Sequence, residues 1–170
     1  APNAFDYLST HMQRLMQDQG VSPAFPGSVF TTAEITSCDA PNFCRFNEDA
    51  AFDTFEAITF LGRYDHTCGG HIIFPDINML FEVPVGSTYL IPSGARSFNF
   101  TAIRKKEYRY MFRQFVSAGV LRWVEKGGRT DAEFDVNASV EERAAWMKMR
   151  SERGKSSLKM FSRLSDFASA

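Results

Sequence analysis

The chain has 170 residues and a formal net charge of −1, and 44% of its residues are hydrophobic. These values are typical of a single globular domain with its own core, and they give no electrostatic case for attraction of the whole chain to nucleic acid or to an anionic membrane. No apolar run is long enough to cross a bilayer. The three cysteines are odd in number and lack CxxC spacing. This argues against a disulfide framework or a zinc site, and it predicts an intracellular location, cytoplasmic or nuclear.

The N-terminal segment has the pattern of one helix followed by a loop. Between Phe5 and Gln19, apolar residues recur at close to helical spacing, with Asn3 as the expected N-cap and Gly20 as the expected stop. Residues 21–43 are rich in proline, so we expect a loop there, with one edge strand over Val29–Ile35.

The middle of the chain reads as a series of short β-strands separated by Gly and Pro turns. The predicted strands are Ala57–Leu61, His71–Phe74, Ile77–Val83, Thr88–Ile91, Ser97–Ile103, Tyr108–Val116 and Gly119–Val124. Short strands with short turns are typical of an antiparallel sandwich or barrel. The seventeen Phe residues suit a β-rich core.

The C-terminal segment is predicted to be helical. Ser139 and Glu142 have the spacing of a capping box, so a helix should begin there and end at Gly154. A second helix is expected over Ser157–Phe167. The whole chain is then one domain, with an N-terminal helix over residues 1–20, a β core over residues 29–126 and C-terminal helices over residues 139–168.

Three segments of the chain, Gly69–Ile77, Phe81–Ser93 and Tyr108–Val124, together resemble the fungal group of TET/JBP-like 2-oxoglutarate/Fe(II) dioxygenases. The resemblance covers roughly Cys38 to Asp131. It implies a double-stranded β-helix of the jelly-roll or cupin-like kind, mainly β with flanking helices (α+β), which agrees with the strand pattern.

The chemistry of that family needs three iron ligands, an HxD pair and a distal His, together with a basic residue that binds the far carboxylate of 2-oxoglutarate. By the resemblance, the HxD position falls on Arg45 and Asn47, and the distal His position on Ser97 or Phe98. The basic residue falls on Arg109. The chain thus keeps the carboxylate partner and replaces every iron ligand, and no HxD occurs anywhere in the sequence.

Two features leave alternatives open. His66, His71 and Asp76, with the acidic residues of Glu48–Asp53, could form a relocated metal site, although their spacing matches no known ligand motif. Arg109 could point outward and pair with an acid on the next strand. If it points inward, it needs an anionic partner, either a ligand or a carboxylate such as that of Glu82.

These observations predict a degenerate dioxygenase-like domain that acts as a binding or interaction module without a cofactor. The expected partner is a small anion or an unidentified protein; a nucleic acid follows only from the family analogy, and a membrane is not expected. One alternative is an active dioxygenase with a non-standard metal site, which would use Fe(II) and 2-oxoglutarate on a nucleobase or another macromolecule. Another is a cupin-like small-molecule binder.

Overall fold

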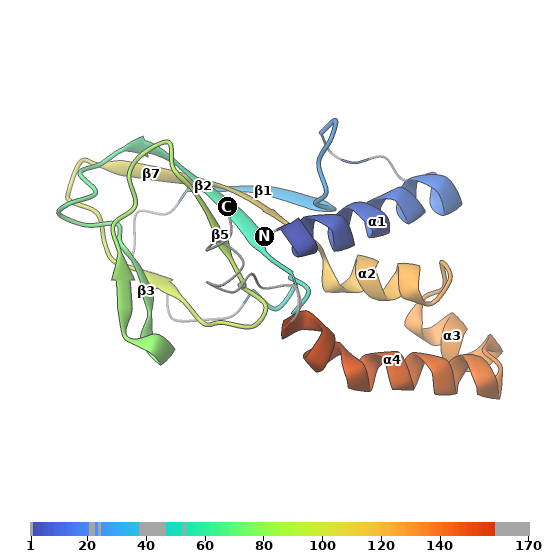
Figure 1. Ribbon diagram of the computed structural model, residues 1–170. Helices are drawn as coiled ribbons and strands as arrows, with labels where there is room; N and C mark the ends of the chain where they lie inside the picture. Colours follow the sequence, from blue (N-terminus) through green and yellow to red (C-terminus); the bar gives the residue numbers. More distant parts are fainter. Residues whose placement is uncertain (1, 21–22, 24, 38–46, 53, 159–170) are drawn as a thin grey trace, which may run out of the picture. The chain divides into compact units, whose positions relative to one another are not determined.

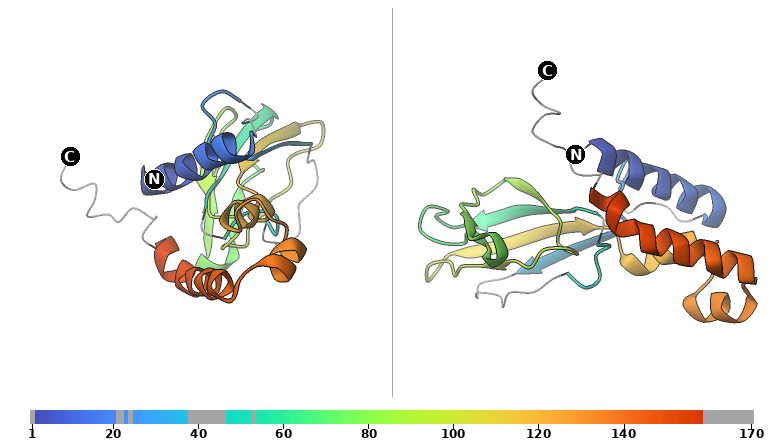
Figure 2. Two further views of the ribbon diagram at one scale, coloured as in Figure 1. Left: turned by 90° about the vertical axis from the view of Figure 1, so that its right-hand side faces the viewer. Right: turned by 60° about the horizontal axis from the view of Figure 1, so that its bottom comes forward.

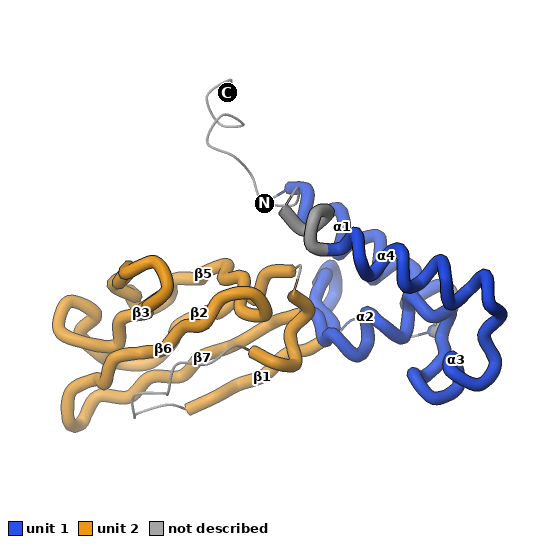
Figure 3. The backbone as a smooth tube through the Cα atoms, turned by 90° about the horizontal axis from the view of Figure 1, so that it is seen from below, with its two compact units in different colours: residues 1–31, 116–170 blue, residues 32–115 orange. Residues whose placement is uncertain are grey.

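The computed structural model describes residues 2–20, 23, 25–37, 47–52 and 54–158. The chain divides into two compact units (Figure 3). We call Thr32–Phe115 the β unit, and Ala1–Thr31 together with Val116–Ala170 the helical unit. The β unit is shorter at both ends than the core predicted over residues 29–126. A single domain over the whole chain stays a prediction, and each unit is described here by itself.

The β unit consists of two antiparallel sheets (Figure 1). The first has the strand order β1 (Thr32–Ser37), β7 (Tyr108–Phe115), β2 (Glu56–Arg63) and β5 (Thr88–Ile91). The second has the order β4 (Met79–Phe81), β3 (Ile72–Phe74) and β6 (Asn99–Phe100). Neighbouring strands such as β1 and β7 are far apart in sequence. After β5 of the first sheet the chain crosses to β6 of the second sheet, and it then returns to the first sheet as β7. This connectivity is that of a jelly roll.

The core of the β unit lies between the two sheets. Ile58 and Phe60 of β2 and Met111 of β7 are buried against Ile72 of β3 and Phe100 of β6. Alternate residues of a strand face the same side, so every second side chain of β2 and β7 enters this core. The Phe60 and Phe100 rings meet edge to face with centroids 5.8 Å apart, an arrangement that aromatic pairs favour. The high Phe content is therefore used in the core, as the composition indicated.

Most predicted strands are present, with changed bounds. Thr88–Ile91 is found as predicted, whereas the strands expected over Ile77–Val83 and Ser97–Ile103 shorten to β4 and β6. Part of the missing length is a 3-10 helix, η1 (Pro75–Ile77), which begins at the proline. The edge strand expected over Val29–Ile35 lies slightly later in the chain, as β1.

The strand predicted over Gly119–Val124 is wrong, because these residues belong to helix α2 (Ala118–Glu125). Val120, Leu121 and Val124 are spaced i, i+1 and i+4, which places them on one helical face as readily as in a short buried strand. The pattern of such a short apolar run cannot distinguish a helix from a buried strand.

The helical unit contains α1 (Pro2–Gln19), α2, α3 (Asp131–Asn137) and α4 (Val140–Leu158) (Figure 1). The N-terminal helix is confirmed, but it begins at Pro2, so Asn3 lies inside it and is not the N-cap. Gly20 follows the helix with a φ of 64°. That left-handed conformation suits glycine and agrees with its predicted role as the stop.

Two capping boxes start the C-terminal helices. The predicted one is confirmed: the backbone N–H of Glu142 donates to Ser139 Oγ at 3.1 Å, and that of Ser139 donates to Glu142 at 2.8 Å. The other pairs Thr130 with Glu133 and begins α3, which the sequence analysis missed. Helix α4 continues past Gly154, and the second helix expected over Ser157–Phe167 lies mostly outside the described residues. None of the described helices is long and apolar enough to span a membrane.

Candidate anion-binding site

Arg109 points into the β unit from near the start of β7, one of the two central strands of the larger sheet. Exposure alternates along β7, where Tyr108 and Tyr110 are exposed and Arg109 is 0% exposed. Directly opposite Arg109 on β2 is Gly62. Of the two orientations considered for Arg109, the structure therefore has the inward one.

The Arg109 guanidinium has few partners for a fully buried cation. Its Nη1 donates to the carbonyl oxygen of Gly70 at 3.1 Å, and its Cζ lies 4.8 Å from the centroid of the Phe100 ring. Its Nε and Nη2 are buried and have no hydrogen-bond partner among the described residues. Buried polar groups in proteins are nearly always hydrogen-bonded, so two open donors on one buried cation indicate a missing acceptor.

The other well-buried cations of the described structure are paired. Lys126 of the helical unit places its Nζ 2.9 Å from a carboxylate oxygen of Asp131 and lies over the Phe134 and Trp146 rings. Arg113, four residues beyond Arg109 on β7, pairs with two glutamates. Arg109 thus differs from both in having no carboxylate partner among the described residues.

The surroundings of Arg109 are formed by small and aromatic residues. Gly70 has a φ of 75°, and a Cβ atom placed on it would lie 3.2 Å from each of three atoms, Arg109 Nη1, Ile103 Cγ2 and Tyr64 Cε2. Only glycine adopts this conformation readily and leaves the guanidinium its space. The residue type at position 70 is therefore explained by the approach of Arg109.

Tyr64 completes the surroundings with a buried phenol. Its hydroxyl donates to the carbonyl oxygen of Val83 at 2.7 Å. Burial raises the pKa of Tyr64 to about 12, although the nearby positive charge of Arg109 lowers it and Tyr89 raises it. The phenol therefore stays neutral at physiological pH and supplies no anion to Arg109.

Glu82, the protein carboxylate considered as a partner for Arg109, lies elsewhere. Its carboxylate is exposed and stands 3.9 Å from Nε2 of His66. This interpretation was wrong because Glu82 follows β4, an exposed strand of the smaller sheet, and points to solvent.

The position aligned with the Asp of the HxD pair holds a polar network. Asn47 Nδ2 donates to Glu56 Oε2 at 3.0 Å, and Arg113 Nε donates to Glu56 Oε1 at 2.5 Å. Glu34 of β1 also accepts from Arg113, at 3.1 Å. The Asn47 amide is thus occupied by a buried carboxylate, and Arg113 supplies the positive charge beside it. Arg45, the other half of this position, lies outside the described residues.

Phe98, one of the two residues expected at the distal His position from the resemblance, belongs to the aromatic core. Phe98 is buried, and its ring lies 5.6 Å from that of Phe100 and 6.2 Å from that of Phe74. Ser97 is only half-buried. A phenyl ring has no lone pair for a metal, so Phe98 could not serve as a metal ligand.

The structure does not gather His66, His71 and Asp76 into one site. His66 faces Glu82, and Asp76 forms an ion pair with Arg96. His71 follows the Gly69-Gly70 turn, and its Nε2 is buried without a hydrogen-bond partner in the part of the chain that the structure describes. Within the described ranges, no three His, Cys, Asp or Glu side chains are close enough to share a metal ion. The described donors therefore do not fit the iron that the family chemistry requires.

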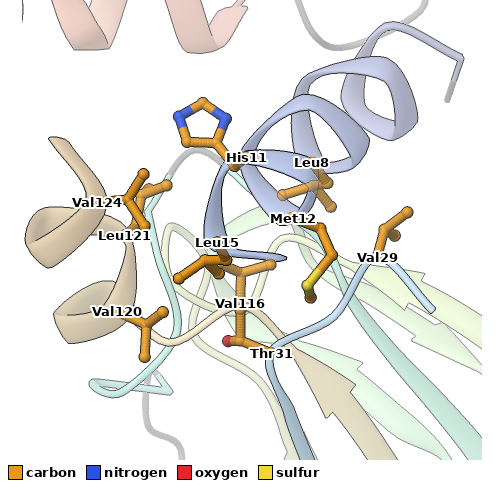
Figure 4. Close-up of a pocket in the computed structure, with 10 residues that line it drawn as sticks. All are labelled: Leu8, His11, Met12, Leu15, Val29, Thr31, Val116, Val120, Leu121 and Val124. Atoms are coloured by element: carbon orange, nitrogen blue, oxygen red, sulfur yellow. The ribbon is translucent and has the colours of Figure 1, made fainter. Parts of the chain in front are cut away.

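The helical unit has a small apolar pocket (Figure 4). Aliphatic side chains of α1 and α2 converge on it, with His11 at its edge. His11 Nδ1 hydrogen-bonds the carbonyl oxygen of Tyr7 at 2.9 Å, and Thr31 Oγ1 accepts from the backbone N–H of Ser117 at 2.9 Å. Since the other lining residues are apolar and belong to packed helices and their flanks, we interpret the pocket as a gap in the packing rather than a ligand site.

Sequence reasoning missed the network around Glu56. Glu56 lies close in sequence to the acidic residues of Glu48–Asp53, yet it is fully buried. A signal was available, since Glu56 begins a strand with Ile58 and Phe60 at alternate positions, which places all three side chains on one face. Its partner Arg113 is 57 residues away and could be identified only from the strand register.

Comparisons with known proteins support the fold. No protein-family model matches the sequence, and no curated protein matches it. Among solved structures, the chain is similar to NgTET1 in complex with 5mC DNA, with a TM-score of 0.55 and 14% sequence identity. The match covers 68% of this chain and 42% of that one, so the chain corresponds to less than half of the NgTET1 structure. A cupin-2 domain protein from Shewanella frigidimarina gives a TM-score of 0.29 at 17% identity, over 62% of this chain and 96% of that one.

At such low identity the likeness to NgTET1 concerns the fold alone. It agrees with the two antiparallel sheets, the jelly-roll connectivity and the helices outside them. The chain therefore has a mainly β, double-stranded β-helix fold of the jelly-roll or cupin-like kind, with flanking helices.

Proposed function

We propose that the β unit is a binding module that holds a small carboxylate against Arg109, and that the chain is a divergent TET/JBP-like protein without iron chemistry. The observation that carries this proposal is the fully buried guanidinium with two open donors. A buried charge without a counter-ion is strongly unfavourable, so a ligand that supplies one binds with a large electrostatic gain.

The geometry of the open donors favours a carboxylate. Nη1 of Arg109 is used by Gly70, which leaves Nε and Nη2. These two nitrogens lie on the same edge of the planar guanidinium and present two parallel N–H groups. A carboxylate accepts both in the bidentate arrangement for which arginine is suited.

The loss of iron chemistry is supported by the residues at the ligand positions. Asn47 is hydrogen-bonded to Glu56, and Phe98 is packed among core rings. In this proposal the chain keeps the arginine of the family pattern and has lost the metal ligands. A dicarboxylate such as 2-oxoglutarate would then be held by one carboxylate and would need no metal.

Isothermal titration of the purified chain with 2-oxoglutarate and with glutarate tests the proposal. Glutarate has both carboxylates but lacks the keto oxygen that chelates a metal. We expect both compounds to bind in the presence of EDTA and Arg109→Gln to abolish binding. The matched control is Arg96→Gln, because Arg96 is an exposed arginine paired with Asp76, and it should leave binding unchanged.

Two results would count against the proposal. Binding of 2-oxoglutarate that requires Mn(II) and is not shared by glutarate would indicate a rebuilt metal centre and an active dioxygenase. Equal binding by the wild-type chain and Arg109→Gln would place the carboxylate elsewhere.

A further inference from the structure

The outer face of the four-stranded sheet carries no carboxylate among its described residues. Register and alternation place thirteen side chains on this face: Ala33, Ile35, Ser37, Ala57, Thr59, Leu61, Arg63, Thr88, Leu90, Tyr108, Tyr110, Phe112 and Gln114. The right-hand view of Figure 2 shows β1, β7 and β2 lying side by side, seen from the side of the smaller sheet. The inner face, by contrast, contains Glu34 and Glu56. The two faces therefore differ in charge as well as in burial.

Two tyrosines stand next to each other at one end of this outer face. Tyr108 and Tyr110 are 46% and 42% exposed, and their ring centroids are 5.8 Å apart. They occupy alternate positions of β7, a central strand, so both rings project from the sheet into solvent. Exposed aromatic rings on a sheet provide stacking surfaces for unpaired bases, because every base has a π face.

Positive charges surround the same end of the sheet. Arg63 lies directly opposite Tyr108 on β2, and Lys105 and Lys106 lie in the turn that leads into Tyr108. All three side chains are exposed, and none forms an ion pair with a described residue.

The carboxylates of the two nearby acids, Glu107 and Asp65, accept hydrogen bonds from residues of the adjacent turns. Glu107 accepts from the backbone N–H groups of Asp65 and Arg104, at 3.1 Å and 2.8 Å. Asp65 accepts from Thr67 and pairs with Arg104. Arg104 balances Asp65, whereas Glu107 keeps its negative charge. Arg63, Lys105 and Lys106 outnumber Glu107, so the net charge at this end of the face is positive.

We propose that this face, centred on Tyr108 and Tyr110 and bordered by Arg63, Lys105 and Lys106, binds single-stranded nucleic acid. The tyrosines stack on bases, and the three cations contact phosphates. A single strand of nucleic acid supplies bases for the tyrosine rings and phosphates for the cations. An apolar protein surface would leave the cations without a counter-charge. The proposal does not depend on Arg109, which lies on the opposite side of the sheet.

Fluorescence anisotropy of a labelled oligothymidylate of about 12 nucleotides, within the site size of single-domain binders, tests the proposal. Three phosphate contacts predict a slope of log affinity against log salt of about −2. Lys105→Gln with Lys106→Asn should make this slope shallower by about 1.4. Asparagine is chosen at position 106 because Lys106 has a φ of 75°, which asparagine tolerates.

The aromatic contribution is isolated by two matched double variants. Tyr108→Phe with Tyr110→Phe keeps the π faces and should retain the affinity. Tyr108→Leu with Tyr110→Leu keeps exposed apolar area but removes the rings, and should weaken binding roughly 5- to 150-fold for each base that loses its stacking partner. Leu90→Ala, at the far end of the same face, should have no effect.

Three outcomes would overturn the proposal. The first is no binding at protein concentrations of roughly 10⁻⁴ M in low salt, the weak limit of non-specific binding. The second is binding that the leucine variants leave unchanged while circular dichroism shows an intact fold. The third is a change of oligomeric state, seen by light scattering, in the leucine variants without any change in oligonucleotide affinity, which would assign the face to a second copy of the chain.

Discussion

The carbonyl oxygen of Gly70 accepts a hydrogen bond of 3.1 Å from Nη1 of Arg109, the one described hydrogen bond of a fully buried guanidinium. The two residues are 39 positions apart in sequence and meet inside the β unit. The contact orients the guanidinium, because it holds Nη1 at Gly70 and leaves the edge formed by Nε and Nη2 without a described hydrogen-bond partner.

Substitution of Gly70 by alanine should affect both stability and ligand binding. The substitution forces a left-handed φ on an alanine, which costs about 1–2 kcal/mol, and its Cβ would lie 3.2 Å from Arg109 Nη1. Gly86→Ala is the matched control, because Gly86 has a φ of 86° and nothing within 4 Å of its Cβ position. Urea unfolding should show a larger loss for Gly70→Ala, and titration with glutarate should show weaker binding for that variant alone. Equal effects of the two substitutions would mean that Gly70 does not shape the site.

The two glutamates that contact Arg113 should contribute unequally to stability. Glu56→Gln leaves a mostly buried guanidinium without its close counter-ion, and we expect a loss of about 3 kcal/mol in the free energy of unfolding. Glu34→Gln removes the other partner, whose side chain is 44% exposed, and should cost less than about 1 kcal/mol. Urea unfolding of the two variants measures the difference. Similar losses would show that burial does not distinguish the two ion pairs.

Tyr64 predicts a loss of stability at high pH. Its pKa is raised by burial from an ordinary value of 10.0 to about 12 in the folded protein. The unfolded chain therefore releases this proton first, so the contribution to stability is complete below pH 10.0 and is lost as the pH rises toward 12. Ultraviolet titration of the phenolate should show a step near pH 12 that Tyr64→Phe removes. A titration curve that is the same in this variant would contradict the assignment.

The sequence was most informative where local chemistry decides the structure. Ser139 and Glu142 form the predicted capping box because both partners lie within one helical turn. The strand Thr88–Ile91 was predicted with its observed bounds because it is preceded by a Pro-Val-Gly-Ser turn and followed by a proline. The jelly-roll fold followed from the run of short strands together with the family resemblance.

The sequence was least informative where distant residues decide the structure. Gly119–Val124 forms a helix because its apolar side pairs with α1, and periodicity within six residues could not show this. The burial of Glu56 depends on Arg113, which the register of β2 and β7 brings next to it. The same register places the Arg109 side chain on the inner face of the sheet. From the alternation of residues alone, both an inward and an outward orientation were possible.

The proposed ligand site requires that the Arg109 guanidinium has no counter-ion within the protein. This requirement is tested by measuring the free energy of unfolding of wild type and Arg109→Met in urea, with and without glutarate. If Arg109 awaits a ligand, Arg109→Met without glutarate should be as stable as the wild type or more stable, since it removes an unpaired buried charge. Glutarate at about 100 times its Kd should then stabilise the wild type by about 2.7 kcal/mol and leave the variant unchanged. A loss of about 3–5 kcal/mol in the ligand-free variant would show instead that a carboxylate of the protein already pairs with Arg109, and the proposed ligand site would be wrong.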